Sequence, residues 1–208
     1  MCGRYVVTNA VTKTSKLVKS AIQTEDSENY NAHPYQNLPV IKKYKNGNAL
    51  ENLKWGIVPG WAKKKDFKAL INARLETIDE KVSFKNLIKL YRCVAVADGF
   101  YEWKREEKVK IPHYFLREDK KTMYIAGIYE KNQFCLITEE SNSNVNKVHH
   151  RQPVVLNEGD VNKYLNLEFS GSNFLKEYKK TNLTFYEVSK EVNIPTNNNI
   201  SLIQRLKS

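Results

Sequence analysis

Short apolar runs separated by polar turns dominate the hydrophobic pattern of the chain. A strand is predicted over residues 5–7, and runs at 38–44 and 49–57 flank the hairpin signal Asn46-Gly47-Asn48. Further β-rich runs follow closely, over 93–97, 101–104, 113–117, 123–129 and 134–138. Because the turns between these runs are short, we expect adjacent strands to pair antiparallel. Two more strands are predicted over 154–156 and 183–188.

Helical spacing occurs at three intervals between the strands. The first predicted helix places four apolar residues on one face: Leu17, Val18, Ala21 and Ile22. The second begins at Thr77 or Asp79 and buries an apolar stripe: Phe84, Leu87, Ile88 and Tyr91. A third is expected within 165–179. Clustered strands without regular βαβ alternation predict an α+β fold, a single domain over 1–208 whose largely antiparallel β-sheet or barrel core is flanked by helices.

Composition adds a charge argument to this picture. The formal charge of +11, from 34 Lys and Arg against 23 Asp and Glu, is large for 208 residues and favours polyanions such as nucleic acid. A Lys-rich compositional bias gives the same charge, so charge alone indicates no particular chemistry. No stretch approaches the ~20 apolar residues of a membrane span, and we expect no membrane contact.

The three cysteines are few and widely spaced. Cys2, Cys93 and Cys135 form no Cys-x-x-Cys pair, which is typical of neither a disulfide framework nor a zinc site. We therefore expect no metal and no cofactor. The residues after Arg4 lack the apolar segment of a secretory signal. Free thiols and this N-terminus together indicate a reducing, cytoplasmic location.

Cys2 directly follows the initiator Met1. Removal of Met1 would leave an α-amine with a reference pKa of about 7.7–8.0 beside a thiol with a reference pKa of about 8.5. Such an amine condenses with an aldehyde to a Schiff base, and the thiol then closes a five-membered thiazolidine ring on the same carbon. Alternatively, Cys2 is a small residue at the start of a strand, and Cys2 by itself does not decide between these interpretations.

Four segments contain candidate chemistry: Met1-Cys2-Gly3-Arg4-Tyr5, Ile71-Asn72-Ala73-Arg74-Leu75-Glu76-Thr77, Ala97-Asp98-Gly99-Phe100-Tyr101-Glu102-Trp103-Lys104 and His149-His150-Arg151-Gln152-Pro153. Together they resemble the SOS-response-associated peptidase family, the abasic-site processing proteins. The resemblance extends through 30–34, 55–61 and 187–189, and so covers nearly the whole chain. It departs from the family pattern at His33-Pro34-Tyr35, Ala62 and Gln152.

The resemblance implies that a covalent thiazolidine forms between Cys2 and the ring-opened sugar of an abasic site in single-stranded DNA, which shields the lesion during the DNA damage response. It implies four catalytic residues: Cys2, Asn72, Glu102 and His149. Asn72 would position Cys2, Glu102 would shuttle protons with a pKa raised by an apolar strand, and His149 would protonate the opening sugar or stabilise the intermediate.

Simpler interpretations of the same residues stay open. Glu102 could be an edge-strand carboxylate paired with Lys104 or Arg105, and Asn72 a turn residue at a strand end. His150 competes with His149; adjacent residues on a strand point to opposite faces, so we expect only one histidine to face the site.

The resemblance also implies DNA contacts by five residues: Gly3, Arg4, Trp61, Arg74 and Arg151. Guanidinium groups bind phosphate oxygens bidentately, and an exposed Trp stacks on bases. The arginines could instead be ion-pair partners, and Trp61 a core residue. We expect a monomer that is nucleoid-associated when bound to DNA. The family name implies a peptidase, interpreted chiefly as self-processing hydrolysis that removes Met1, alongside Schiff-base, lyase-like chemistry.

Two other classes of function are consistent with parts of the sequence. An N-terminal-nucleophile amidotransferase also begins Met-Cys-Gly, but the segments around Asn72, Glu102 and His149 fit it poorly. A non-covalent RNA- or DNA-binding module would use the basic surface alone, with salt-reversible binding that is indifferent to Cys2→Ala.

Overall fold

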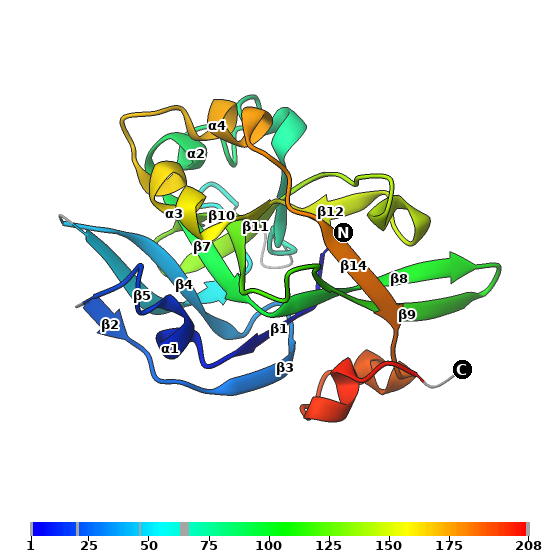
Figure 1. Ribbon diagram of the computed structural model, residues 1–208. Helices are drawn as coiled ribbons and strands as arrows, with labels where there is room; N and C mark the ends of the chain where they lie inside the picture. Colours follow the sequence, from blue (N-terminus) through cyan, green and yellow to red (C-terminus); the bar gives the residue numbers. More distant parts are fainter. Residues whose placement is uncertain (1, 20, 46, 63–66, 207–208) are drawn as a thin grey trace.

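Two β-sheets form the core of the computed structural model, which describes residues 2–19, 21–45, 47–62 and 67–206 (Figure 1). In strand order, the first sheet comprises β14 (Leu183–Glu187), β9 (Val109–Arg117), β8 (Gly99–Glu106), β1 (Tyr5–Thr8) and β3 (Glu28–Ala32). All of its neighbouring strands are antiparallel. In this sheet β1 lies between β8 and β3, so the N-terminal strand is an interior strand.

The second sheet closes on itself. Its strands run in the order β12 (Arg151–Pro153), β11 (Gln133–Glu140), β10 (Met123–Glu130), β7 (Arg92–Ala97), β4 (Asn37–Tyr44), β5 (Gly47–Trp55) and β2 (Ala21–Gln23). A parallel pairing of β11 with β5 joins strands from opposite parts of this path. Two short strands are added at its sides, β13 (Val155–Leu156) on β10 and β6 (Asn72–Arg74) on β11. The resulting ring of β11, β10, β7, β4 and β5 is a small barrel.

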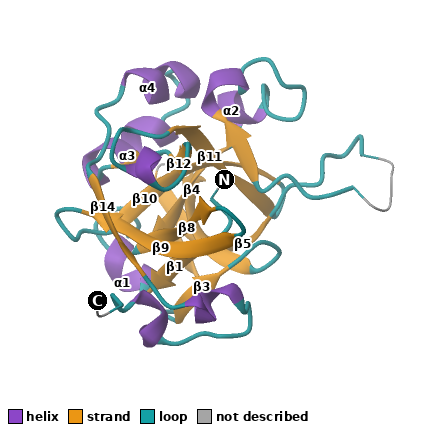
Figure 2. Ribbon diagram, turned by 90° about the vertical axis from the view of Figure 1, so that its right-hand side faces the viewer, coloured by secondary structure: helices purple, strands orange, loops and turns teal. Residues whose placement is uncertain are grey.

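The helices are short and lie outside the sheets. α2 (Leu87–Leu90), α3 (Glu158–Leu165) and α4 (Gly171–Glu177) gather at one end, and α1 (Ala10–Thr14) lies at the other (Figure 2). The remaining helical turns are 3₁₀: η1 (Leu75–Thr77), η2 (Val145–Lys147), η3 (Lys190–Asn193) and η4 (Ile200–Ile203). None of the helices in the described ranges is long and apolar enough to cross a membrane.

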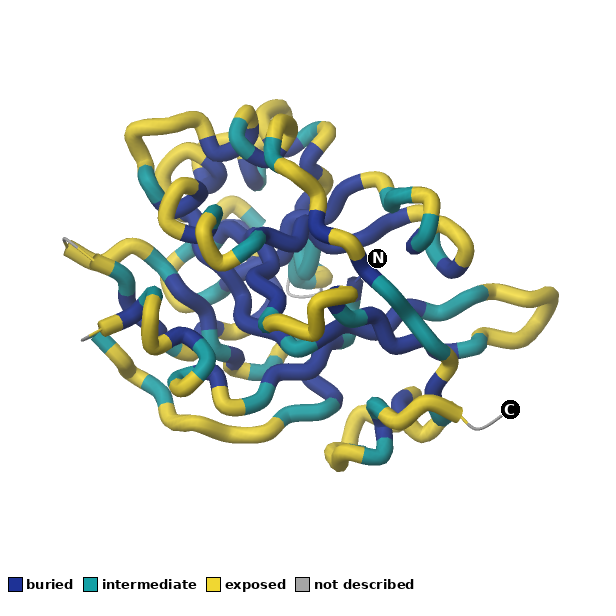
Figure 3. Tube along the Cα trace, viewed as in Figure 1, coloured by how far each residue is buried: buried dark blue, intermediate teal, exposed yellow. Residues whose placement is uncertain are grey.

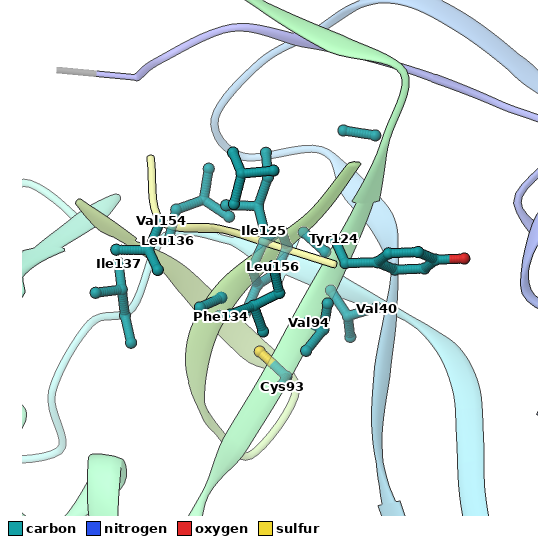
Figure 4. Packing of buried hydrophobic residues seen from close by; sticks show 14 of the residues in the cluster. Val40, Cys93, Val94, Tyr124, Ile125, Phe134, Leu136, Ile137, Val154 and Leu156 are labelled. Atoms are coloured by element: carbon teal, nitrogen blue, oxygen red, sulfur yellow. The ribbon is translucent and has the colours of Figure 1, made fainter. Parts of the chain in front are cut away.

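The barrel strands supply most of the apolar core. Every residue of β7 is buried, which explains its nearly continuous apolar sequence (Figure 3). Side chains from β4, β7, β10 and β11 meet inside, among them Val40, Val94, Ile125 and Leu136 (Figure 4). The thiols of Cys93 and Cys135 are buried there and are not joined in a disulfide. These two cysteines therefore pack as small apolar residues.

The predicted α+β class and most of the predicted strands are confirmed. Strands occur at each of the predicted β-rich runs, and β4 pairs antiparallel with β5 as the hairpin signal indicates. Asn46 of that signal lies outside the described residues. The pairing of consecutive strands is only partly as expected, because β7 and β8 belong to different sheets. They meet at Asp98, whose carboxylate accepts a hydrogen bond from Thr8 Oγ1 at 2.8 Å and forms an ion pair with Lys13, so the chain turns from one sheet into the other.

One predicted helix is wrong, and a second is shorter than expected. Residues 21–23 form β2, which pairs in parallel with β5, and Ile22 is exposed; only Val18 of the expected face is buried. The second predicted helix is reduced to α2, preceded by turns; Phe84, Leu87 and Ile88 are buried as expected, whereas Tyr91 is exposed. Around Val18 apolar spacing was a poor guide because tertiary pairing with β5 draws residues 21–23 into a strand. The helix expected within 165–179 is confirmed as α4.

Gly99 generates a stability prediction. A Cβ at this position in β8 would collide with the ring of Tyr114 and the carbonyl oxygen of Phe115. We expect Gly99→Ala to lower the free energy of unfolding by about 2 kcal/mol or more, because overpacking a filled site forces backbone shifts. Gly159→Ala is the control, since a Cβ there meets nothing within 4 Å and the residue lies in α3. Urea unfolding measures both, and equal stability of the two variants would contradict the prediction.

Candidate active site

The register of β1 against β8 brings Cys2 next to Glu102. Tyr5 lies opposite Phe100, and the backbone N–H of Tyr101 donates to the carbonyl oxygen of Arg4 at 2.9 Å. Continuing this ladder toward the N-terminus places residue 3 opposite residue 102, and the neighbouring Cys2 lies close enough to Glu102 for the carboxylate charge to act on its thiol. Cys2 is completely buried there, and Glu102 is only 3% exposed.

Asn72 fixes the backbone of Cys2. Its Nδ2 donates a hydrogen bond to the carbonyl oxygen of Cys2 at 2.8 Å. β6 holds Asn72 by pairing in parallel with β11, and the indole Nε1 of Trp55 donates to the carbonyl oxygen of Ile71 at 2.9 Å. The oxygen of the same amide, Oδ1, is buried and has no hydrogen-bond partner among the described residues. Asn72 thus presents an open acceptor in the immediate neighbourhood of Cys2.

Burial changes the proton affinities of Cys2 and Glu102 in the same direction. The pKa of Glu102 is raised above its usual range because the carboxylate is desolvated. The pKa of the Cys2 thiol is raised by burial and, to a lesser extent, by the negative charge of Glu102, while the backbone N–H of Arg4 lowers it slightly. The reference thiol pKa used in the sequence argument therefore does not apply, and the thiol is neutral at pH 7. Its activation requires a proton acceptor beside it.

His149 completes the cluster. Its Nε2 lies 4.0 Å from Glu102 Oε2, and its Nδ1 lies 3.1 Å from the backbone N of Arg151. The turn η2 positions the ring, since the backbone N–H of His149 donates to the carbonyl oxygen of Val145 at 3.0 Å. Burial is the largest cause that lowers the pKa of His149, to about 4. The imidazole is therefore neutral at pH 7 and can accept a proton or relay one.

His149, not His150, is the histidine that approaches Glu102. The expectation that the two rings point to opposite faces of a strand is wrong, because both residues precede β12 and their rings stack with centroids 4.5 Å apart. His150 is exposed and lines a groove of about 330 Å³ with Arg74 and Ser141. One simpler interpretation paired Glu102 with Lys104 on the same strand. Lys104 instead forms an ion pair with Glu106, with Nζ 2.6 Å from Oε1.

The candidate DNA-binding residues fall into two groups. Arg74 and Trp61 are exposed, and Trp61 rests its ring edge-on against Phe67 at 5.8 Å. Gly3 is half-buried beside Cys2. Arg4 and Arg151, by contrast, are engaged within the protein: Arg4 Nη1 donates to Asn31 Oδ1 at 2.6 Å, and Arg151 is 5% exposed. Of the three arginines, Arg74 is the one whose surroundings leave it available to a phosphate.

Two residues that the sequence argument left unassigned hold these arginines. Glu76 forms a two-pronged ion pair with Arg151, with Nη1–Oε1 at 2.7 Å and Nη2–Oε2 at 3.0 Å. Asn31 is buried and links Arg4 to the C-terminal segment by donating to the carbonyl oxygens of Ile194 at 3.0 Å and Asn197 at 2.9 Å. Glu76 lies inside one of the motif segments, which is a usable signal; the role of Asn31 depends on contacts about 160 residues apart and has no local signal.

No group of three or more His, Cys, Asp or Glu side chains is arranged to hold a metal ion within residues 2–19, 21–45, 47–62 and 67–206. The polar cluster of Cys2, Asn72, Glu102 and His149 consists instead of a nucleophile, an amide and two groups whose pKa values burial shifts in opposite directions. A carboxyl that binds its proton more tightly beside an imidazole that binds it less tightly is an arrangement suited to proton transfer.

Comparison with known proteins identifies a family and a shared fold. The family model described as SOS response associated peptidase (SRAP) matches residues 1–195. The chain is 32% identical to the abasic site processing protein YoqW of Bacillus phage SPbeta, over 98% of this chain and 99% of that protein. It is 33% identical to the abasic site processing protein YoaM of Bacillus subtilis (strain 168), over 98% of this chain and 97% of that protein. A solved structure of a protein from Bacteroides thetaiotaomicron has the same fold, with a TM-score of 0.82 at 22% identity, covering 99% of this chain and 100% of that one.

The lowered pKa of His149 predicts an imidazole titration midpoint near pH 4, well below the ~6.5 of a free histidine. Between these values the unfolded chain binds more protons than the folded one, so this group lowers the stability as the pH falls through that window. His149→Gln removes the contribution, and its free energy of unfolding should fall less on acidification than that of the wild type. NMR of the histidine rings, with the His149 signal assigned by its loss in the variant, measures the midpoint. A midpoint at or above ~6.5 would contradict the prediction.

Proposed function

The chain belongs to the SOS response associated peptidase family, and from that premise we propose that it captures abasic sites in single-stranded DNA through Cys2 after Met1 is removed. Its relatives YoqW and YoaM are named abasic site processing proteins. The single observation that carries the proposal is the burial of Cys2 beside Glu102, with Asn72 bound to its carbonyl oxygen and His149 near the same carboxylate. That arrangement surrounds an aminothiol with groups able to move protons.

The proposed reaction has two steps. The α-amine of Cys2 adds to the C1′ aldehyde of the ring-opened sugar, and loss of water gives an imine. The thiol then adds to the imine carbon; a C–S bond forms, the C=N bond becomes single, and the thiol proton passes to the nitrogen. The thiazolidine retains all atoms of the imine and the thiol, so the overall release is one water. No oxidant or reductant is consumed.

Each neighbouring residue has a defined place in these proton transfers. The raised pKa of Glu102 lets its carboxylate take a proton from the amine or the thiol and return it to the departing oxygen. Neutral His149 lies next to Glu102 and can exchange that proton, which suits a role in opening the sugar. Asn72 Oδ1, the open acceptor, fits an N–H of the free amine. The family name supports peptidase activity, which we assign to self-processing at Met1.

Crosslinking to DNA tests the proposal directly. Wild-type protein incubated with a single-stranded oligonucleotide that carries one abasic site should give a shifted band on a denaturing gel that survives heating in detergent. Cys2→Ala retains the amine but lacks the thiol, so we expect a band only after borohydride reduction of the imine. A variant with Lys inserted between Met1 and Cys2 no longer has the α-amine and the thiol on one residue, so it should bind the DNA without forming the thiazolidine crosslink.

The same experiment distinguishes the other classes of function. An undiminished, reduction-independent band from Cys2→Ala would show that the thiol is not the nucleophile. Release of ammonia from glutamine, without a DNA band, would indicate an amidotransferase. Salt-reversible binding alone, unaffected by Cys2→Ala, would indicate a non-covalent nucleic-acid-binding module.

The proton-transfer roles predict slower capture in two variants. At saturating DNA, Glu102→Gln and His149→Ala should each lower the first-order rate of crosslinking by about 10²-fold, the scale of general acid–base catalysis. Glu106→Gln is the matched control, because Glu106 is an exposed carboxylate on the same strand that pairs with Lys104. Single-turnover gel kinetics measure the rates, and affinity is measured separately with undamaged DNA. A wild-type rate in both variants would reject the assigned roles.

A further inference from the structure

A basic groove lies at the end of the β4–β5 hairpin. It has a volume of about 1100 Å³ and is lined by four lysines, Lys16, Lys19, Lys43 and Lys45, together with Tyr44 and Asn48. The lysines come from two segments, the stretch after α1 and the end of β4. In Figure 1 the adjoining ends of β4 and β5 lie on the left, whereas β8, which contains Glu102, extends to the right.

Asn48 fastens the walls of this groove to one another. Its Nδ2 donates to the carbonyl oxygen of Leu17 at 3.0 Å and to Asn162 Oδ1 at 2.8 Å. One side chain therefore links the stretch after α1, the start of β5 and helix α3. These contacts hold the walls in place, so the lysines are presented on a preformed surface.

The charge of the groove is largely uncompensated. All four lysines are exposed, and none of them forms an ion pair with a described residue. Neighbouring Lys42 behaves differently, since it binds Glu51 at 2.6 Å. The one carboxylate on the lining, Glu168, accepts a hydrogen bond from the side-chain amide of Asn166 at 3.2 Å. Four unpaired ammonium groups facing one groove favour a polyanion.

Tyr44 adds a surface for bases. It is 42% exposed, and Lys45 Nζ lies 5.4 Å from the centre of its ring. An exposed aromatic ring interleaved with lysines is the combination that binds single strands, because the lysines contact phosphates while a base stacks on the ring. Bases in a duplex are already stacked and cannot use such a ring.

The groove is separate from the reacting residues. β5 runs from Gly47 at the groove to Trp55, whose indole contacts the residue before Asn72. At ~3.3 Å per residue, these nine residues place the two ends about 26 Å apart. A single DNA strand that contacts both the groove and Cys2 must therefore extend several nucleotides beyond the abasic site.

We propose that this groove binds single-stranded DNA non-covalently through its phosphates and Tyr44, as a second contact remote from Cys2. The identity of the strand rests on the proposed function, because an abasic-site protein already handles single-stranded DNA. The groove would retain undamaged strand next to the lesion and raise the local concentration of DNA at the site.

Charge-neutral substitution tests the groove. The variant combines Lys16→Gln, Lys19→Gln, Lys43→Gln and Lys45→Gln. Its control removes four other exposed lysines and thus the same net charge: Lys81→Gln, Lys85→Gln, Lys89→Gln and Lys131→Gln. Fluorescence anisotropy with an undamaged oligonucleotide of about 30 nucleotides should show weaker binding by the groove variant only. The slope of log K against log salt should decrease in magnitude by up to about 3, at ~0.7 per phosphate contact.

Substitutions of Tyr44 test the stacking contact. Tyr44→Ala should weaken binding of the same undamaged oligonucleotide, whereas Tyr44→Phe should retain it, because only the ring is required. Equal affinities of the groove variant and its control would overturn the proposal. A larger loss for RNA than for DNA of the same sequence would also overturn it, by identifying RNA as the occupant.

The length of the abasic oligonucleotide separates this proposal from the catalytic one. With about five nucleotides and a central abasic site, the strand reaches only about 14 Å from the lesion, even at twice the stacked spacing of ~3.4 Å per phosphate. Both lysine variants should then crosslink at the wild-type rate. With about 30 nucleotides at limiting concentration, the groove variant alone should crosslink more slowly. Absence of wild-type crosslinking to either length would reject the proposed function, whereas an effect of the groove variant on the short strand would reject the groove.

Discussion

The placement of β1 between β8 and β3 is the constraint on which the candidate site depends. A chain terminus usually frays, because its backbone groups find partners in water. Here β1 is paired on both edges, Arg4 Nη1 donates to Asn31 Oδ1 at 2.6 Å and to the carbonyl oxygen of Val192 at 2.8 Å, and Asn72 holds the carbonyl oxygen of Cys2. Distant parts of the chain thus converge on the first residues. The N-terminal residue left after removal of Met1 would begin at a fixed place inside the protein.

Burial at that place controls the chemistry through one physical effect. Desolvation disfavours every charged form, so it raises the pKa of Cys2 and of Glu102 and lowers the pKa of His149. A thiolate and a carboxylate side by side would be doubly unfavourable. Moving a proton between neighbouring groups costs less free energy than creating an isolated charge. In the proposed reaction, acid–base partners next to Cys2 would therefore accept the thiol proton directly, and a low thiol pKa would not be needed. The reference pKa of a thiol does not apply to Cys2, because that value describes a solvated group.

Local sequence signals predicted the parts of the fold that local interactions determine. The β4–β5 hairpin and the strands from β7 to β11 follow from apolar runs and short turns. Parallel pairing of β2 with β5 left no local signal, and the helical spacing around Val18 was misleading. Motif segments pointed to Cys2, Asn72, Glu102 and His149, but they could not show that Arg151 is bound by Glu76, since that pair depends on the packing of segments 75 residues apart.

Exposed and buried charges have separate effects in this molecule because solvent screens them differently. The Debye length at physiological salt is about 8 Å, whereas the lysine groove lies about 26 Å along β5 from the residues near Cys2. The lysines are therefore too distant to alter the proton affinities of Glu102 and His149, which depend on local burial. A net charge of +11 can accordingly favour DNA binding while Cys2 and Glu102 stay buried. In the proposed function, different residues therefore determine affinity for the strand and reactivity toward the lesion, and salt should weaken the first much more than the second.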